Sequence, residues 1–208
     1  MFAVVTDGNI TSFPNGNKGI QIGDIQYPAA IYTLWSEAER NAIGVYTVVE
    51  DNTNKKDGDW YNNTNQTCAF GSGKVTATYG SATAKAIADT TWTSQDKTDG
   101  KIPSGKDVGD LKTEGLKTIK KRNIDNQCAG LLAPSDWRVI REQETGNAMD
   151  SDWKTWRAAV RTKCNSMQTQ ITNAANVDAL AALFAYVNTG TEENPVMERP
   201  LGEFPVKS

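Results

Sequence analysis

The sequence predicts an α+β protein: a small antiparallel β-rich unit at the N-terminus, followed by a helical hairpin or bundle. Three observations predict this class. Short runs of alternating apolar and polar residues, separated by turn sequences, fill residues 1–92. Residues 93–110 are almost all polar, with Gly and Pro among them. After that stretch the apolar residues recur at helical spacing, up to residue 187.

These observations divide the 208 residues into four parts. Residues 1–92 form the β-rich unit, 93–110 a polar loop or linker at the domain boundary, and 111–187 the helical domain. Residues 188–208 form a tail, whose Pro195, Pro200 and Pro205 exclude one regular element. Such a segment is expected to be mobile unless contacts hold it in place.

Turn and capping signals set the elements of the β-rich unit. Asp7-Gly8 is a hairpin turn between two short apolar runs. Ser36 and Glu39 fit the capping-box pattern that opens a helix, and Gly44 is placed to end it. Strands are expected at residues 2–6, 10–13, 20–22, 25–27, 45–49, 60–61 and 75–79.

The helical domain is organised around one long amphipathic helix. At ~100° per residue, six residues fall within a sector roughly 80° wide, close to the spacing of a coiled-coil seam. They are Trp153, Trp156, Val160, Cys164, Met167 and Ile171. Residues 150–152 supply the N-cap candidates, and Asp150 is placed to pair with Lys154. Asn176 caps a second helix, with Val177, Leu180, Phe184 and Val187 facing inward, so that an αα-hairpin forms.

Residues 111–132 are also compatible with a helix, whose best inward face is polar. That face holds Leu116, Ile119, Asn123, Asn126 and Gly130. Buried asparagines of this kind fix register in a bundle or oligomer, and the alternative is an exposed helix with weak packing. The basic run from Lys117 to Arg122 is interpreted as a solvated face. The net charge of −3 gives no general attraction to nucleic acid, so none is expected as a partner.

The composition argues against catalysis, and we expect no enzymatic activity, no cofactor and no metal site. There is no histidine, which removes the commonest general base and the commonest metal ligand. The three cysteines are widely spaced and odd in number, which favours reduced thiols. The first residues are not expected to be a signal peptide, and no membrane partner is expected. A glycan hydrolase using carboxylate pairs at Glu142 and Glu144, or at Asp150 and Asp152, is the weaker alternative to solvated charges.

Tryptophan and arginine side chains mark the candidate partner-binding residues. Both types are enriched at the energetically dominant positions of protein interfaces. The candidates are Trp153, Trp156, Arg157 and Arg161 on the long helix, together with Trp137 before it. Arg157 and Arg161, one turn apart, could offer a planar donor pair to a partner's carboxylate. The alternatives are that the tryptophans belong to the chain's own core and that the arginines are a solvated flank.

Two blocks of residues resemble a bacteriophage family, whose members pair an N-terminal β-rich segment with a C-terminal helical segment. The C-terminal block is Leu131-Leu132, Ser135-Asp136-Trp137, Arg141, Glu144-Thr145-Gly146 and Trp156-Arg157-Ala158-Ala159-Val160-Arg161. The N-terminal block is Tyr27-Pro28, Ile31-Tyr32, Leu34-Trp35-Ser36-Glu37-Ala38-Glu39 and Ile43-Gly44-Val45-Tyr46. Together they cover about half of the chain, and residues 51–130 match only loosely.

Members of this family are described as tail-fibre assembly proteins, or as tail and baseplate proteins with an uncharacterised domain. The resemblance implies a non-enzymatic protein that docks other tail proteins of the fibre or baseplate and is oligomeric in the assembly. It would be made in the host cytoplasm and reside in the virion tail. The alternative is a tail-fibre assembly chaperone, a transient partner that helps a fibre protein fold or trimerise.

Overall fold

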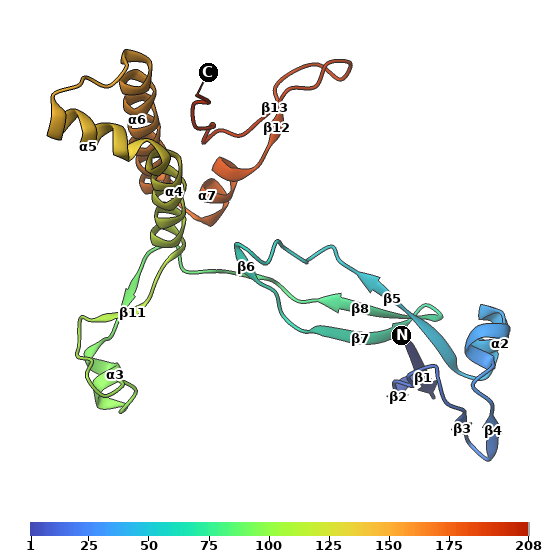
Figure 1. Ribbon diagram of the computed structural model, residues 1–208. Coiled ribbons are helices and arrows are strands. Elements are labelled where there is room, and N and C mark those ends of the chain that lie inside the picture. Colours follow the sequence, from blue (N-terminus) through green and yellow to red (C-terminus); the bar gives the residue numbers. More distant parts are fainter. Residues whose placement is uncertain (208) are drawn as a thin grey trace. The chain divides into compact units, whose positions relative to one another are not determined.

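The computed structural model describes residues 1–207, which fall into two compact units, Met1–Thr83 and a second that begins at Ala84. The first unit contains a five-stranded sheet and the second contains the long helices (Figure 1). The predicted α+β class is therefore confirmed. The division between the units comes before residues 93–110, where the sequence predicted the domain boundary.

The first unit is built on a sheet with the strand order β2-β1-β5-β8-β7. Its strands are β1 (Phe2–Thr6), β2 (Asn9–Ser12), β5 (Val45–Asp51), β7 (Gln66–Gly71) and β8 (Lys74–Tyr79). Neighbouring strands are antiparallel except for β5 and β8, which run parallel and depart from the expected antiparallel unit. The two edge strands, β2 and β7, contact each other, so the sheet curls.

Local signals explain the turns of this unit. Asp7 and Gly8 both have positive φ angles, 49° and 78°, as the tight turn between β1 and β2 requires. Helix α1 (Ile31–Leu34) is followed by α2 (Glu37–Ala42), which begins at the predicted capping box. There the Glu39 amide donates to the Ser36 hydroxyl (3.3 Å), and the Ser36 amide donates to the Glu39 carboxylate (2.8 Å). Gly44 follows with φ +82°, and a Cβ there would lie 2.6 Å from the Val5 carbonyl oxygen.

Two small cores hold the first unit together. One consists of Ala3, Val48, Val75 and Ala77 on the sheet, and the other of Ile31, Tyr32 and Val45, where α1 meets β5. Short strands lie outside the main sheet. They are β3 (Ile20–Ile22), β4 (Ile25–Tyr27), β6 (Tyr61–Asn62) and β9 (Thr83–Ala84).

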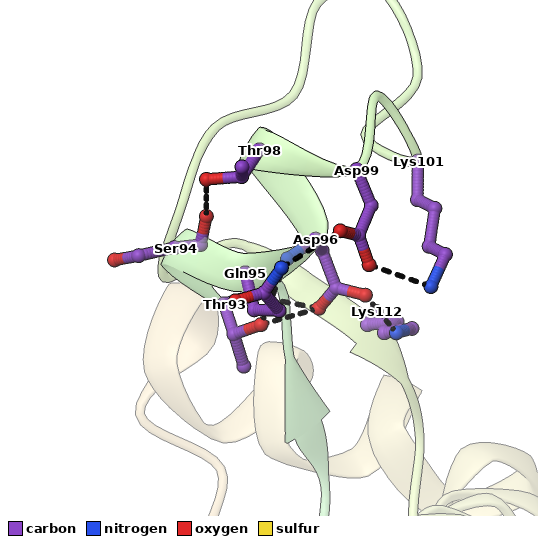
Figure 2. A network of polar contacts seen from close by, with 8 residues as sticks. All are labelled: Thr93, Ser94, Gln95, Asp96, Thr98, Asp99, Lys101 and Lys112. Carbon is purple, nitrogen blue, oxygen red and sulfur yellow. Dashed lines mark hydrogen bonds and ion pairs between the residues drawn. The ribbon is translucent and has the colours of Figure 1, made fainter.

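Residues 90–113 form a folded arm rather than the predicted polar linker. Strands β10 (Thr90–Thr91) and β11 (Leu111–Thr113) pair, and α3 (Ser94–Thr98) lies between them. Figure 2 shows why this polar segment is ordered. Thr93 and Asp96 form a capping box, with the Thr93 amide 3.0 Å from Asp96 Oδ2, and Lys112 Nζ donates to Asp96 Oδ1 at 2.8 Å. Hydrogen bonds of this kind take the place of an apolar core.

The helical part of the second unit packs α4 (Leu116–Leu132) along α6 (Ser151–Asn173). Along the chain, η1 (Ala133–Ser135) and α5 (Asp136–Thr145) connect α4 to α6, and α7 (Val177–Phe184) follows α6. The buried apolar residues of these two helices are Leu116, Ile124 and Cys128 of α4 and Val160, Cys164, Met167 and Ile171 of α6. The predicted seam of α6 is confirmed for its last four members, and α4 rather than α7 is its main cover.

Two details of the helices differ from the sequence expectation. Asn123 and Asn126 are exposed, so the predicted polar inward face of α4 is wrong. Its buried residues Leu116, Ile124 and Cys128 follow one another at intervals of eight and four positions, which are close to whole turns of the helix. Asn176 does cap α7, because its side-chain oxygen accepts from the Ala179 amide at 2.8 Å. Val187, expected to face inward, is 48% exposed.

The tail is folded onto the helices. Strands β12 (Val187–Asn188) and β13 (Met197–Glu198) form a hairpin. After it, the Leu201 amide donates to the Leu183 carbonyl at 3.0 Å, and the Leu201 side chain is completely buried. The expectation of an irregular tail therefore applies only in part, since contacts within the chain hold it. No helix among residues 1–207 is long and apolar enough to cross a membrane.

Candidate protein-docking surface

Arg157 fixes the start of α5 to the second turn of α6. Its side chain is 5% exposed, and its Nη2 lies 2.6 Å from Asp136 Oδ1. Its Nη1 donates to the Leu132 carbonyl at 2.8 Å and also to the Ser135 hydroxyl. Ser135, itself fully buried, donates to the same carbonyl at 2.8 Å. A buried guanidinium needs such partners, and here they close the connection between α4 and α5.

Local signals define the two ends of α5. Pro134 lies in the first turn of η1, and Asp136 places a negative charge in the first turn of α5. At the other end Gly146 has φ +73°, and its amide donates to the Glu142 carbonyl at 3.0 Å, a glycine C-cap.

Two ion pairs tie α5 to the first turns of α6. Lys154 Nζ lies 2.5 Å from Glu142 Oε1, and Arg138 Nη1 lies 3.4 Å from Asp150 Oδ2. The hydrogen bond from Lys154 holds the pKa of Glu142 below its usual value. Asp150 and Lys154 were expected to pair within the helix, but both turn to α5 instead.

Trp137 and Ile140 form an exposed apolar face on α5, and Val139, on another side of the helix, is also exposed. No residue of this helix is buried. Trp137 is 51% exposed, Val139 43% and Ile140 55%. Trp137 and Ile140 are three residues apart and therefore lie on the same side of the helix. Neighbouring exposed apolar side chains on a helix are typical of surfaces that another protein covers.

Arginine and tryptophan side chains alternate between α5 and α6. The Arg138 guanidinium carbon lies 4.7 Å from the ring centre of Trp137 and 4.7 Å from that of Trp153. Arg141 lies 5.3 Å from the Trp137 ring. Trp153 in turn meets Trp156 edge to face, with ring centres 5.6 Å apart. These cation–π and aromatic contacts orient the indoles without burying Trp137.

Trp156 belongs to the contact between α6 and the tail. Its indole Nε1 donates to the Pro205 carbonyl at 2.9 Å, and Lys207 Nζ lies 5.2 Å from the Trp153 ring centre. Both tryptophans of α6 are half-buried. The chain itself therefore covers much of the surface that the sequence assigned to a partner.

The five predicted partner-binding residues separate into two groups. Trp137 and Arg161 are exposed and available to a neighbour. Trp153 and Trp156 are half-covered by the chain's own residues, and Arg157 is turned inward with its partners already in place. Arg157 was predicted to contact a partner, but its burial and its hydrogen bonds give it a structural role within the chain. Val139 and Ile140 are also exposed apolar residues, and the sequence did not single them out. The three-residue spacing of Trp137 and Ile140 could have indicated that they share one side of a helix.

The displaced pKa values of the carboxyl groups follow one pattern. Among residues 1–207, each carboxyl group whose pKa is displaced is displaced downward by hydrogen bonds from neighbouring groups. These are Glu39, Asp51, Asp89, Asp96, Asp99, Glu114 and Glu142.

The described residues contain no cluster of three or more potential metal ligands. Compared with protein-family models, curated proteins and solved structures, the chain matches none.

Proposed function

We propose that this chain is a non-enzymatic bacteriophage tail protein, associated with the fibre or the baseplate, that docks neighbouring tail proteins in the virion. The resemblance of its two sequence blocks to such proteins motivates the proposal. It is made in the host cytoplasm and becomes part of an oligomeric assembly. The helix α5, rather than the seam of α6, is its docking element.

The uncovered apolar face of α5 carries the proposal. Trp137 and Ile140 are each about half exposed on a helix that buries none of its residues. Moving a fully exposed apolar side chain into a protein interior is worth roughly 1.5–3 kcal/mol, so a side chain that is already half covered gains about half of that. A neighbour that covers both side chains therefore gains a binding core, and the flanking Arg138 and Arg141 supply a polar rim.

Mass spectrometry of purified phage particles tests this role. A structural protein is expected at a fixed ratio to the other tail proteins after the particles are banded in a density gradient. Particles assembled with Trp137→Ser and Ile140→Ser should contain at least ten-fold less of the protein. The matched control is Leu34→Ser, which changes a side chain that is 79% exposed in the first unit. Mature particles that lack the wild-type protein would refute a structural role.

A tail-fibre assembly chaperone is the second candidate, because the resembling family includes assembly proteins. A chaperone would use the same face of α5 but leave before the particle is complete. Co-expression with a fibre protein from the same phage separates the two roles. A chaperone raises the yield of soluble, trimeric fibre and is absent from particles, whereas a structural protein leaves that yield unchanged.

A further inference from the structure

A small cavity opens between α5 and α6, next to the apolar face of α5. Its volume is about 260 Å³, and it is lined by Val139, Glu142, Met149, Lys154, Arg157 and Arg161. Three of these six residues are cationic and one is acidic. Arg157 and Arg161, which the sequence singled out together, thus meet at one cavity, although only Arg161 is exposed.

The charges around the cavity do not cancel. Arg157 is paired with Asp136, and Lys154 is paired with Glu142. Within residues 1–207, no ion pair joins Arg161 to a carboxylate, so one positive charge remains at the mouth. The planar guanidinium of an arginine can bind a carboxylate through two parallel hydrogen bonds.

The rest of the lining is apolar. Met149 is 5% exposed, and Val139 lies on α5 one position before Ile140. Together they offer contacts to the methylene groups of a side chain, which an inorganic anion would not use. The cavity thus combines an unpaired donor with an apolar wall, the complement of an acidic side chain on an aliphatic stem.

We propose that this cavity receives a glutamate side chain of the neighbouring protein, with the guanidinium of Arg161 as its donor. This proposal rests on the docking role of α5 and names the chemistry of the partner: an acidic side chain that enters the cavity beside an apolar contact with Trp137 and Ile140. The acidic residue fixes the register of the partner on α5, because a one-turn shift would leave its charge on an apolar surface.

Nuclear magnetic resonance with a small probe tests the cavity directly. The ¹⁵N-labelled protein is titrated with N-acetyl-glutamate amide and, at equal ionic strength, with the neutral N-acetyl-glutamine amide. The Met149 amide and the Arg161 Nε–H are expected to shift with the glutamate probe only. Arg161→Gln should weaken that binding about five-fold or more. Lys163→Gln, which removes a cation from the same helix outside the cavity, should leave it unchanged.

Three outcomes of the titration with the two amino-acid probes overturn the proposal. They are equal shifts with the acidic and neutral probes, no shift at the highest probe concentration, and binding that Arg161→Gln does not weaken. Inorganic phosphate forms a further arm of the experiment. If phosphate binds as tightly as the glutamate probe, the cavity is a general anion site, and the proposal for a side chain falls.

The probe experiment and the particle experiment fail independently. Loss of the protein from particles would remove the docking role but leave an acid-selective cavity in place. Conversely, if the Arg161→Glu variant is incorporated into particles at the wild-type ratio, the proposed glutamate contact is refuted, whereas the docking role of α5 is not. In that case Trp137→Ser would still reduce incorporation.

Discussion

The guanidinium of Arg157 lies 2.6 Å from the carboxylate of Asp136, although the two residues are 21 positions apart. The pair is asymmetric, because the arginine side chain is 5% exposed and the aspartate side chain 56%. Solvent therefore screens the attraction between the charges. Much of the stabilisation by Arg157 comes instead from its hydrogen bonds to the buried Ser135 and the Leu132 carbonyl.

Replacing Arg157 should destabilise the second unit. Arg157→Ala removes the donor to the buried Ser135 hydroxyl and one of the two donors to the Leu132 carbonyl, and we expect a loss of about 2 kcal/mol in the free energy of unfolding. Arg161→Ala removes an exposed arginine from the same helix and should change it by less than about 0.5 kcal/mol. Urea titrations followed by circular dichroism measure both. Equal losses for the two variants would contradict a structural role for Arg157.

The tail should contribute to stability through a single leucine. Leu201 is completely buried, so Leu201→Ala is expected to cost about 2–4 kcal/mol. Val206, five positions on, is 90% exposed, and Val206→Ala should cost almost nothing. Thermal unfolding of the two variants compares them directly. If the leucine variant is as stable as the valine variant, the tail is not packed as described.

Acid should loosen the arm of residues 90–113. The hydrogen bond from Lys112, followed by those from Thr93, holds the pKa of the Asp96 carboxyl well below its usual range. A carboxylate whose pKa is lower in the folded state stabilises the fold at pH above the usual value of about 3.9. That contribution is lost as the pH falls below this value toward the lowered pKa.

Amide exchange and carboxyl titration by nuclear magnetic resonance measure this effect. Lys112→Gln should raise the pKa of Asp96 toward its usual range and shift the loosening of the arm to higher pH. Lys97→Gln is the control, because Lys97 and Asp107 form a pair with both side chains mostly exposed. An unchanged titration of Asp96 in the Lys112 variant would exclude this cause.

The three thiols should differ in reactivity. Burial, and next the hydrogen bond with Cys128, raise the pKa of Cys164 to about 11, so only about 0.1% of it is thiolate at pH 8. Cys128 is also buried, whereas Cys68 on β7 is half-buried. A colorimetric disulfide reagent should label Cys68 first and the other two only after unfolding. Cys68→Ser should abolish the fast phase, and a fast phase that persists would contradict the order.

Local signals in the sequence predicted the elements whose causes are local. The Asp7-Gly8 turn, the Ser36 capping box and the Asn176 cap each depend on residues within a few positions. The inward face of α4 was missed because a lysine lies on it. Lys120, between the buried Leu116 and Ile124, places its ammonium group 5.3 Å from the Phe184 ring centre. The aliphatic part of a lysine side chain can pack inward while its ammonium group stays in solvent. A search for apolar residues at helical spacing does not detect this.

The candidate site was only partly predictable. The enrichment of tryptophan and arginine pointed to the segment of α5 and α6, but it could not tell an arginine that packs inward from one that faces out. Arg157 and Arg161 are one turn apart on α6. They differ because Arg157 hydrogen-bonds to Ser135 of η1 and is buried, whereas Arg161 is exposed. Likewise, the apolar side of α5 can be read from the sequence, whereas its exposure depends on how α4 and α6 pack against each other.

The contact between β2 and β7 restricts how another chain can engage the first unit. A sheet with an open edge can accept an additional strand, which is a common route to both specific docking and aggregation. Here the two outer strands approach each other and hinder that route. Partners of this five-stranded sheet would therefore be recognised through side chains rather than by strand addition.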